Sequence, residues 1–269
     1  MTRTSISDFE GIYLEAVRAA LDDEEAFAAF RRLPGIVSTI ENVSPAWGAE
    51  YRSIALRQTP QLMAHLERFR SSDTVGRPDT APFPEGMMSP TTWRYIKVVS
   101  DLTMLFGDLR QWDVVEIGAG YGGQCKIISD VYDVSSYTIY DLEPVARLAG
   151  KFLQRMVPAA AGTVRFADFR RLADGTPRTY DLVISNWALS ECTRQIQDLY
   201  IEHVLRRSRR GYITYNQISQ PYGIDSYTKP EIVEALGFPA QLIPEGLSVR
   251  VPEEREFFVL HWQSQPFLD

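Results

Sequence analysis

Cysteine is scarce in this chain of 269 residues, which contains only Cys125 and Cys192. Neither belongs to a Cys-x-x-Cys pattern, so the sequence indicates neither a disulfide scaffold nor a zinc site built on cysteine. Histidine is also rare, with three residues, and none is spaced with acidic residues as a metal-ligand set. We therefore predict no metal site, although a divalent cation acting as a Lewis acid stays open.

Long apolar runs are missing as well. None reaches the ~20 residues that a membrane-spanning helix needs, and residues 1–8 lack the apolar stretch of a signal peptide. We expect no membrane insertion and a reducing, cytoplasmic location. Basic residues are in the minority, because 28 Lys and Arg face 35 Asp and Glu, for a formal net charge of -7. An acidic chain is not generally attracted to phosphate backbones, so we expect no nucleic-acid partner.

The first third of the chain has the pattern of short helices. Apolar residues recur at helical spacing in several stretches before residue 72 and again over residues 92–106. Between them, residues 72–90 contain four prolines and two glycines, which predicts a loop. We interpret residues 1–110 as a helical N-terminal cap and the loop at 72–90 as a lid that keeps water from a site.

From residue 111 the pattern alternates between strand and helix. Predicted strands lie at residues 113–117, 137–140, 163–166, 181–184 and 211–215, and predicted helices at 122–131, 143–156, 193–207 and 229–236. Alternation of this kind predicts a parallel sheet covered by helices on both faces. Segments 247–251 and 257–261 lack a long helix between them, which predicts a terminal antiparallel hairpin. We therefore expect residues 111–269 to form one α/β, Rossmann-like domain on a mostly parallel seven-stranded sheet.

A glycine-rich turn follows the first of these strands, in the sequence Glu-Ile-Gly-Ala-Gly-Tyr-Gly-Gly over residues 116–123. Glycine is needed where a backbone takes positive φ or approaches a ligand closely. Glu116 lies two residues before the first glycine, where a carboxylate can meet a cationic amino group and would repel a pyrophosphate. The turn therefore favours a nucleoside-type ligand without a pyrophosphate.

Acidic residues also end the next two predicted strands. Asp141 is placed where an acid can hold both ribose hydroxyls. Asp168 is placed to accept a hydrogen bond from an adenine amine, with Phe166 or Phe169 beside the ring. Because the carboxyl ends of parallel strands meet at one edge of a sheet, these acids and the glycine turn together predict a nucleoside-type cofactor site.

In these motifs the chain resembles the class I S-adenosylmethionine-dependent methyltransferases, over about residues 112–262. The resemblance implies S-adenosylmethionine as the cofactor and a methyltransferase activity. The residues that we predict to contact the cofactor are Glu116, Gly118, Ala119, Gly120, Tyr121, Asp141, Leu142, Asp168, Phe169 and Ser185. A narrower similarity, to the sugar O-methyltransferases, rests on Thr-Trp-Arg-Tyr at 92–95, the glycine turn and Ser-Asn-Trp-Ala-Leu-Ser-Glu at 185–191. It implies transfer to a hydroxyl of a sugar or glycosylated small molecule.

The segment 185–191 follows the fourth strand, at the mouth of the expected crevice. Asn186 and Trp187 offer an amide and a flat ring to a polar acceptor, and we add Tyr95 and Glu191 to the predicted acceptor site. Glu191 is the candidate general base. Its alternative role is to complement the dipole of the following helix.

Asn186, Tyr121 and His203 are further catalytic candidates. His203 lies within a predicted helix, where a packing role is the alternative.

Three other functions stay open for this sequence. The acceptor could be a phenolic, carboxylate or amine small molecule, or the chain could be a binding protein that keeps the fold without catalysis. A nicotinamide-dependent reductase is disfavoured by Glu116 and by the terminal hairpin. The sequence also leaves a homo-oligomer open.

Overall fold

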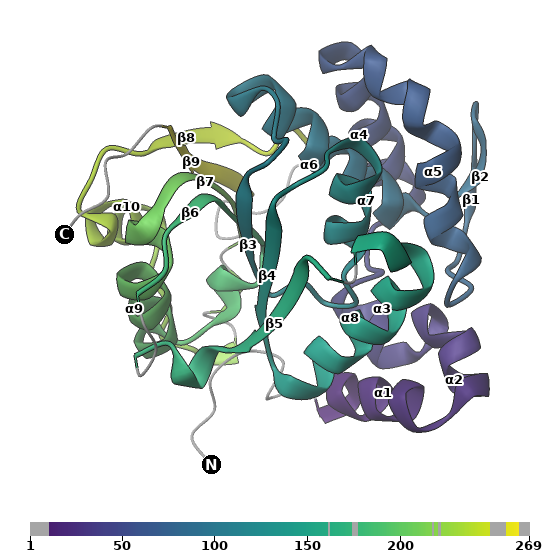
Figure 1. The fold of residues 1–269 in the computed structure, drawn as a ribbon, viewed down its shortest axis with the longest axis horizontal. Helices are drawn as coiled ribbons and strands as arrows, with labels where there is room; N and C mark the ends of the chain where they lie inside the picture. Colours follow the sequence, from purple (N-terminus) through teal and green to yellow (C-terminus); the bar gives the residue numbers. More distant parts are fainter. Residues whose placement is uncertain are drawn as a thin grey trace.

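A seven-stranded sheet forms the centre of the molecule (Figure 1). The computed structural model describes residues 11–160, 162–173, 177–216, 218–219, 222–247 and 257–263. The strands are β3 (Asp113–Ile117), β4 (Ser136–Asp141), β5 (Val164–Asp168), β6 (Tyr180–Asn186), β7 (Ser208–Tyr215), β8 (Gln241–Pro244) and β9 (Phe258–Trp262). Their order is β5-β4-β3-β6-β7-β9-β8, and only the pairs that include β9 are antiparallel. The predicted mostly parallel seven-stranded sheet with an antiparallel end is therefore confirmed.

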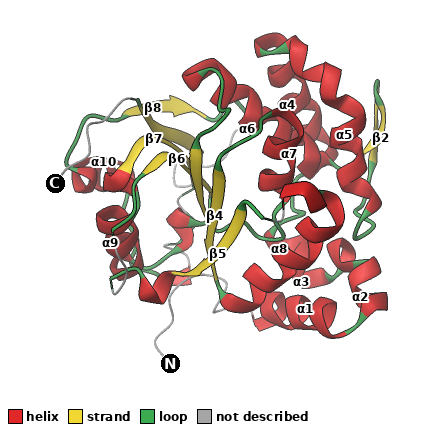
Figure 2. Ribbon diagram, in the orientation of Figure 1, coloured by secondary structure: helices red, strands yellow, loops and turns green. Residues whose placement is uncertain are grey.

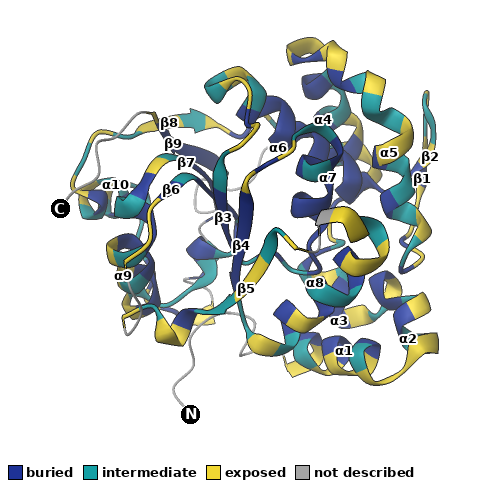
Figure 3. Cartoon of the chain, viewed as in Figure 1, coloured by how far each residue is buried: buried dark blue, intermediate teal, exposed yellow. Residues whose placement is uncertain are grey.

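Helices cover both faces of this sheet (Figure 2). Helices α6 (Pro90–Phe106), α7 (Gly123–Val131) and α8 (Glu143–Met156) pack on one face, and α9 (Arg194–His203) and α10 (Lys229–Leu236) on the other. Successive strand residues point to opposite faces, so Val114 belongs to one core and Val115 to the other. Both are fully buried, and the central strands are dark blue in Figure 3. The sheet is thus the middle layer of three.

Five α-helices come before α6 in the described chain: α1 (Gly11–Asp22), α2 (Glu24–Ala28), α3 (Pro34–Thr39), α4 (Pro45–Gln58) and α5 (Leu66–Ser71). They join the core on the α6–α8 face, where α1 packs on α3 and α8, and α4 on α6. Local signals start them: Ser44 accepts a hydrogen bond from the Trp47 amide at 3.2 Å, and Pro45 occupies the first turn of α4. A domain boundary near residue 110 stays a prediction.

The prediction of a loop over residues 72–90 was wrong in part. This segment contains a short 3-10 turn (Ser72–Thr74) and a two-stranded hairpin of β1 (Ala81–Phe83) and β2 (Gly86–Met88). The prolines are compatible with strands here because each strand of a two-stranded sheet is an edge strand. Tertiary contacts hold the hairpin against α4 and α6: Arg52 forms a 2.5 Å ion pair with Glu85, and Phe83 packs edge-on against Trp93.

The terminal antiparallel pair is present, but its first strand comes earlier than predicted. It is β8 at Gln241–Pro244, with Ile243 opposite Val259 of β9. Of the predicted strand at 247–251, residues 248–251 lie outside the described residues. The edge strand β8 is largely exposed (Figure 3), so it carries little of the apolar signal that reveals a strand in a sequence. None of the helices in the described ranges is long and apolar enough to cross a membrane.

Candidate functional site

Two adjoining cavities lie at the carboxyl ends of β3, β4 and β6, where the strand order reverses. In open α/β sheets this switch point is the usual ligand site. The first, which we call the polar cavity, has a volume of about 90 Å³ and is lined by Tyr13, Thr39, Ile40, Arg94, Tyr95, Glu116, Gly118, Ala119, Gly120, Asp141, Asn186, Trp187, Ala188 and Glu191. The second, the apolar cavity, has about 80 Å³ and is lined by Ile117, Gly118, Tyr140, Asp141, Leu142, Phe169, Ala188, Glu191, Cys192, Ile196 and Tyr200. Four shared residues, including Asp141 and Glu191, make them one cleft.

The glycine turn forms the floor of this cleft. Gly118 has a φ of +72°, and a Cβ added there would overlap with the Cβ of Ala188. Gly120 has a φ of +55°, and its Cβ would lie 2.7 Å from the Cδ1 of Ile40. Both positions thus need glycine for conformation and for space, and the backbone itself faces the cavity.

The N-terminus of α7, directly after the turn, is packed against α6. A Cβ at Gly123 would overlap with the ring of Tyr95. Dinucleotide-binding folds place the pyrophosphate at the corresponding helix N-terminus. The ring of Tyr95 therefore lies beside the position that a pyrophosphate takes in such folds.

Glu116 is a buried carboxyl group at the wall of the polar cavity. Its residue is 1% exposed, and Oε2 accepts a hydrogen bond from the Tyr137 hydroxyl at 2.7 Å. Burial raises the pKa of Glu116 to about 8, and the charge of Asp141 adds to the shift. Without a cationic partner this carboxyl is mainly protonated at neutral pH, and a cationic ligand group would favour its ionised form.

Asp141 ends β4 between the two cavities. Its carboxylate accepts hydrogen bonds from the backbone amides of Gly120 at 3.2 Å and Leu142 at 2.7 Å. Removal from solvent raises the pKa of Asp141 to about 7, although these bonds favour the charged form. Asp141 therefore holds the glycine turn in place and still presents an acceptor to the cleft.

These carboxyl groups predict how stability depends on pH. The native state binds the Glu116 proton more tightly than the unfolded chain, whose pKa is near 4.5. The resulting stabilisation is present below that pH and is lost as the pH rises towards 8, by up to about 1.4 kcal/mol per pH unit. We expect the melting temperature of the ligand-free protein to fall between pH 5.5 and 8, and Glu116→Gln to make that fall shallower. The control is Glu67→Gln on exposed α5; an equally steep profile for Glu116→Gln would contradict the assignment.

The predicted acceptor residues come together at the end of β6. Trp187 has a φ of +67°, and its ring lies between the Arg94 guanidinium, at 4.6 Å, and the stacked ring of Phe257, at 5.4 Å. Asn186 donates to Gln124 Oε1 at 3.4 Å, while its buried Oδ1 has no partner within the described part of the chain. Glu191 accepts a hydrogen bond from Asn216 Nδ2 at 3.1 Å. With Tyr95 from α6, they form one wall of the polar cavity.

The chain is similar to known proteins at the level of solved structures. No family model matches the chain, and no match is found among curated proteins. Among solved structures, the chain is similar to a sarcosine dimethylglycine methyltransferase candidate from Galdieria sulphuraria, at 16% identity over 58% of this chain and 65% of that one, with a TM-score of 0.48.

Two further solved structures show the same level of similarity. One is an S-adenosylmethionine-dependent methyltransferase from Clostridium acetobutylicum, at 10% identity over 61% of this chain and 87% of that one, with a TM-score of 0.48. The other is a magnesium protoporphyrin IX methyltransferase from Synechocystis with bound S-adenosylhomocysteine, at 15% identity over 78% and 96%, with a TM-score of 0.46. At these values, conclusions about function rest on the residues of the cleft.

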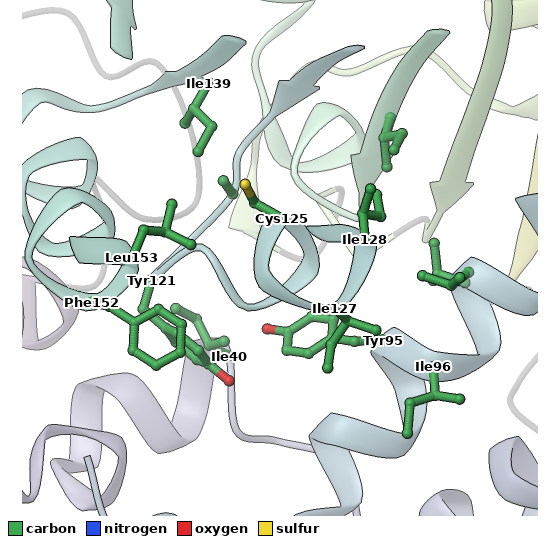
Figure 4. Close-up of a cluster of buried hydrophobic side chains, with 14 of the residues drawn as sticks. Ile40, Tyr95, Ile96, Tyr121, Cys125, Ile127, Ile128, Ile139, Phe152 and Leu153 are labelled. Carbon is green, nitrogen blue, oxygen red and sulfur yellow. The ribbon is translucent and has the colours of Figure 1, made fainter. Parts of the chain in front are cut away.

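Two predicted site residues have packing roles instead. Tyr121 is 1% exposed and lies among Ile40, Phe152 and Leu153, as Figure 4 shows, and its hydroxyl donates to Glu41 at 2.9 Å. An aromatic residue in the glycine turn thus anchors the turn to the helical layer and does not face the cleft. Ser185 is also buried: its hydroxyl donates to the Ile117 carbonyl at 3.0 Å and accepts from the Leu189 amide at 3.1 Å. The cofactor contacts of Tyr121 and Ser185 stay predictions, and neither residue lines the two cavities.

Asp168 and His203 line a separate surface cavity beside β5 and are not among the residues that line the cleft. Asp168 is engaged by Arg170 two residues later, through a 2.8 Å ion pair that lowers the pKa of the carboxyl. His203 is the last residue of α9, which places it near the opposite ends of the strands from the cleft. The adenine contact of Asp168 and the catalytic role of His203 stay predictions that the lining of the cleft does not support. Phe169 and Leu142, in contrast, line the apolar cavity.

Sequence reasoning missed the residues that cover the cleft from the N-terminal helices. Tyr13 of α1, Thr39 of α3 and the following Ile40 line the polar cavity, as does Arg94 of α6. None of residues 72–90 lines either cavity, so the lid role of that segment stays a prediction that the cavity lining does not support. A signal existed only for Arg94, in the Thr-Trp-Arg-Tyr motif. No group of three or more His, Cys, Asp and Glu side chains able to hold a metal is found among the described residues.

Proposed function

We propose that this protein is an S-adenosylmethionine-dependent methyltransferase. The observation that supports it most is the composition of the cleft: a buried carboxyl at one end, an apolar cavity at the other, and Asp141 between them. A nucleoside that carries an amino acid and no phosphate matches this sequence of groups. The ring of Tyr95 beside the N-terminus of α7 argues against a dinucleotide.

The residues present fit the cofactor part by part. Leu142, Phe169 and Tyr200 offer apolar surfaces for the adenine ring in the apolar cavity. Asp141 would accept hydrogen bonds from the ribose hydroxyls, and Glu116 would meet the cationic amino group. The cavities of about 90 and 80 Å³ are smaller than the ~300 Å³ at the low end for ligand pockets. We therefore expect the helices α1 and α3, which cover the cleft, to move outward when the cofactor binds.

The chemistry is a displacement at a methyl carbon. When bound, S-adenosylmethionine supplies an electrophilic methyl group on a sulfonium. Asn186 and Trp187 would hold the acceptor so that its oxygen lies in line with the methyl carbon and the sulfur. Glu191, on the same wall, would take the hydroxyl proton as the new bond forms. Tyr13 and Ile40, which line the polar cavity from the N-terminal part of the chain, would exclude water from the reacting groups.

For the acceptor, we propose a hydroxyl of a sugar or glycosylated small molecule. The amide of Asn186 and the ring of Trp187 support this choice, because polar groups and a flat face together suit a sugar ring. Calorimetric titration with S-adenosylhomocysteine tests the cofactor assignment on which the acceptor depends, and we expect a micromolar dissociation constant.

A further inference from the structure

Arg94 is a buried cation on the wall of the polar cavity. It is 7% exposed, and its guanidinium lies 4.6 Å from the centre of the Trp187 ring and 5.4 Å from that of Tyr95. Its Nη2 reaches the Ile40 carbonyl only at 3.5 Å, and its buried Nε has no partner within the described part of the chain. Aromatic faces thus surround Arg94, and much of its hydrogen-bonding capacity is unused.

The other buried cations of the described chain are each matched by a carboxylate. Arg31 pairs with Glu41 at 2.7 Å, Lys97 with Asp101 at 2.7 Å, and Lys126 with Asp130 at 2.5 Å. No carboxylate of the described residues lies within 4.0 Å of the Arg94 guanidinium. A buried charge is normally paired because desolvation is costly, and contact with aromatic rings offsets only part of that cost. The buried Glu245 carboxyl acts on Arg94 only from beyond contact distance, and it already accepts a hydrogen bond from the Tyr51 hydroxyl. Arg94 is therefore the buried cation of the described residues that has no carboxylate in contact, and it lines the cleft.

We propose that Arg94 binds a carboxylate group of a ligand in the polar cavity. Its planar fork of donors matches the two oxygens of a carboxylate, and contact with the rings of Trp187 and Tyr95 restricts the movement of the guanidinium. The inference rests on the proposed function, because the cofactor must share this cavity. It extends that function by naming a chemical group, a carboxylate, that the ligand of this cavity must carry.

Two ligands could supply the carboxylate: the amino-acid end of the cofactor, or an acidic acceptor. If the cofactor supplies the carboxylate, Arg94 would bind the carboxylate of its amino-acid end and Glu116 would bind the amino group. The acceptor source would restrict the enzyme to acidic acceptors. S-Adenosylhomocysteine and 5′-methylthioadenosine separate these sources, because they share the nucleoside and thioether but only the first has the amino-acid end.

The experiment measures the affinity of both compounds for the full chain and for Arg94→Gln and Arg94→Lys. Arg52→Gln is the matched control, because Arg52 also lies over a tryptophan ring but pairs with Glu85 outside the cleft. If the cofactor supplies the carboxylate, Arg94→Gln should lower the affinity for S-adenosylhomocysteine by about tenfold or more and leave the affinity for 5′-methylthioadenosine unchanged. Arg94→Lys keeps the charge without the planar fork of donors, so its loss of affinity should be smaller. This variant decides the test if Arg94→Gln does not fold.

An acidic acceptor predicts a different pattern. Arg94→Gln would then bind both nucleosides normally, while acetate, followed by ligand-observed NMR on the S-adenosylhomocysteine complex, would bind the wild type and not the variant. Acetamide, which has no charge, should bind neither. The proposal is overturned if the substitution changes neither S-adenosylhomocysteine nor acetate binding, or if it weakens both nucleosides equally. A wild-type protein that binds neither nucleoside would instead contradict the proposed function.

Discussion

Glu191→Gln should lower turnover by about 10²–10⁴-fold and leave the affinity for S-adenosylhomocysteine nearly unchanged, if Glu191 is the general base. The structure supports this expectation by placing Glu191 on the wall shared by both cavities, beside Asn186 and Trp187. The hydrogen bond from Asn216 Nδ2, at 3.1 Å, orients the carboxylate. Glutamine keeps the shape and cannot accept the proton, so the rate of methyl transfer is the measurement that responds.

A structural role for Glu191 predicts another outcome. Glu191 ends the short 3-10 turn Leu189–Glu191, three residues before α9 begins, where a negative charge complements the helix dipole by ~0.3–1 kcal/mol. Loss of that contribution would lower the melting temperature slightly and leave turnover intact. Glu202→Gln, on the exposed face of α9, is the matched control for charge removal. Full activity in a less stable Glu191→Gln protein would exclude the catalytic role.

Asp141→Ala should weaken S-adenosylhomocysteine binding by about a hundredfold. The substitution removes the acceptor for two ribose hydroxyls, and two charge-assisted hydrogen bonds of ~1.5 kcal/mol each amount to that factor. It also removes the bonds to the amides of Gly120 and Leu142, which hold the glycine turn. Asp141→Asn keeps one acceptor oxygen, so we expect a smaller loss. Calorimetry with both variants measures the effect, and an unchanged dissociation constant would place the ribose elsewhere.

Asp168→Ala is the matched control for that experiment. The two aspartates are register partners at the ends of β4 and β5, but only Asp141 reaches the cleft. Asp168 instead pairs with Arg170 at the surface. We expect the affinity to stay within a few-fold of wild type when Asp168 is removed. A loss of affinity as large as that of Asp141→Ala would indicate that Asp168 contacts the adenine, and it would contradict the position of Asp168 outside the cleft.

Sequence patterns predicted the parts of the site that are local in the chain. The glycine turn, Asp141 and the segment from Asn186 to Glu191 each follow a predicted strand directly. Parallel strands bring their carboxyl ends to one edge, so predicting the strands was enough to bring these residues together. Strand position alone did not reveal that the Asp168 carboxylate pairs with an arginine two residues later.

The cover of the cleft could not be predicted in this way. Tyr13, Ile40 and Arg94 reach the glycine turn from helices that lie far from it in sequence, and only the packing of α1, α3 and α6 decides which side chains face inward. Residues 72–90 show the opposite error, since their prolines and glycines indicated a loop whereas contacts with α4 and α6 stabilise a hairpin. The position of Tyr121 in the glycine turn suggested that its ring faces a ligand. In the structure the ring packs against Phe30 and Phe152, which come from distant segments of the chain.

A calorimetric comparison of S-adenosylhomocysteine with NAD tests the central claim most directly, since the two ligands differ in the groups that the cleft distinguishes. Glu116 at the polar cavity, whose carboxylate would meet an amino group and repel a pyrophosphate, predicts micromolar binding of S-adenosylhomocysteine and no detectable binding of NAD. Binding of NAD without binding of S-adenosylhomocysteine would contradict the assignment of the cleft as a methyltransferase site.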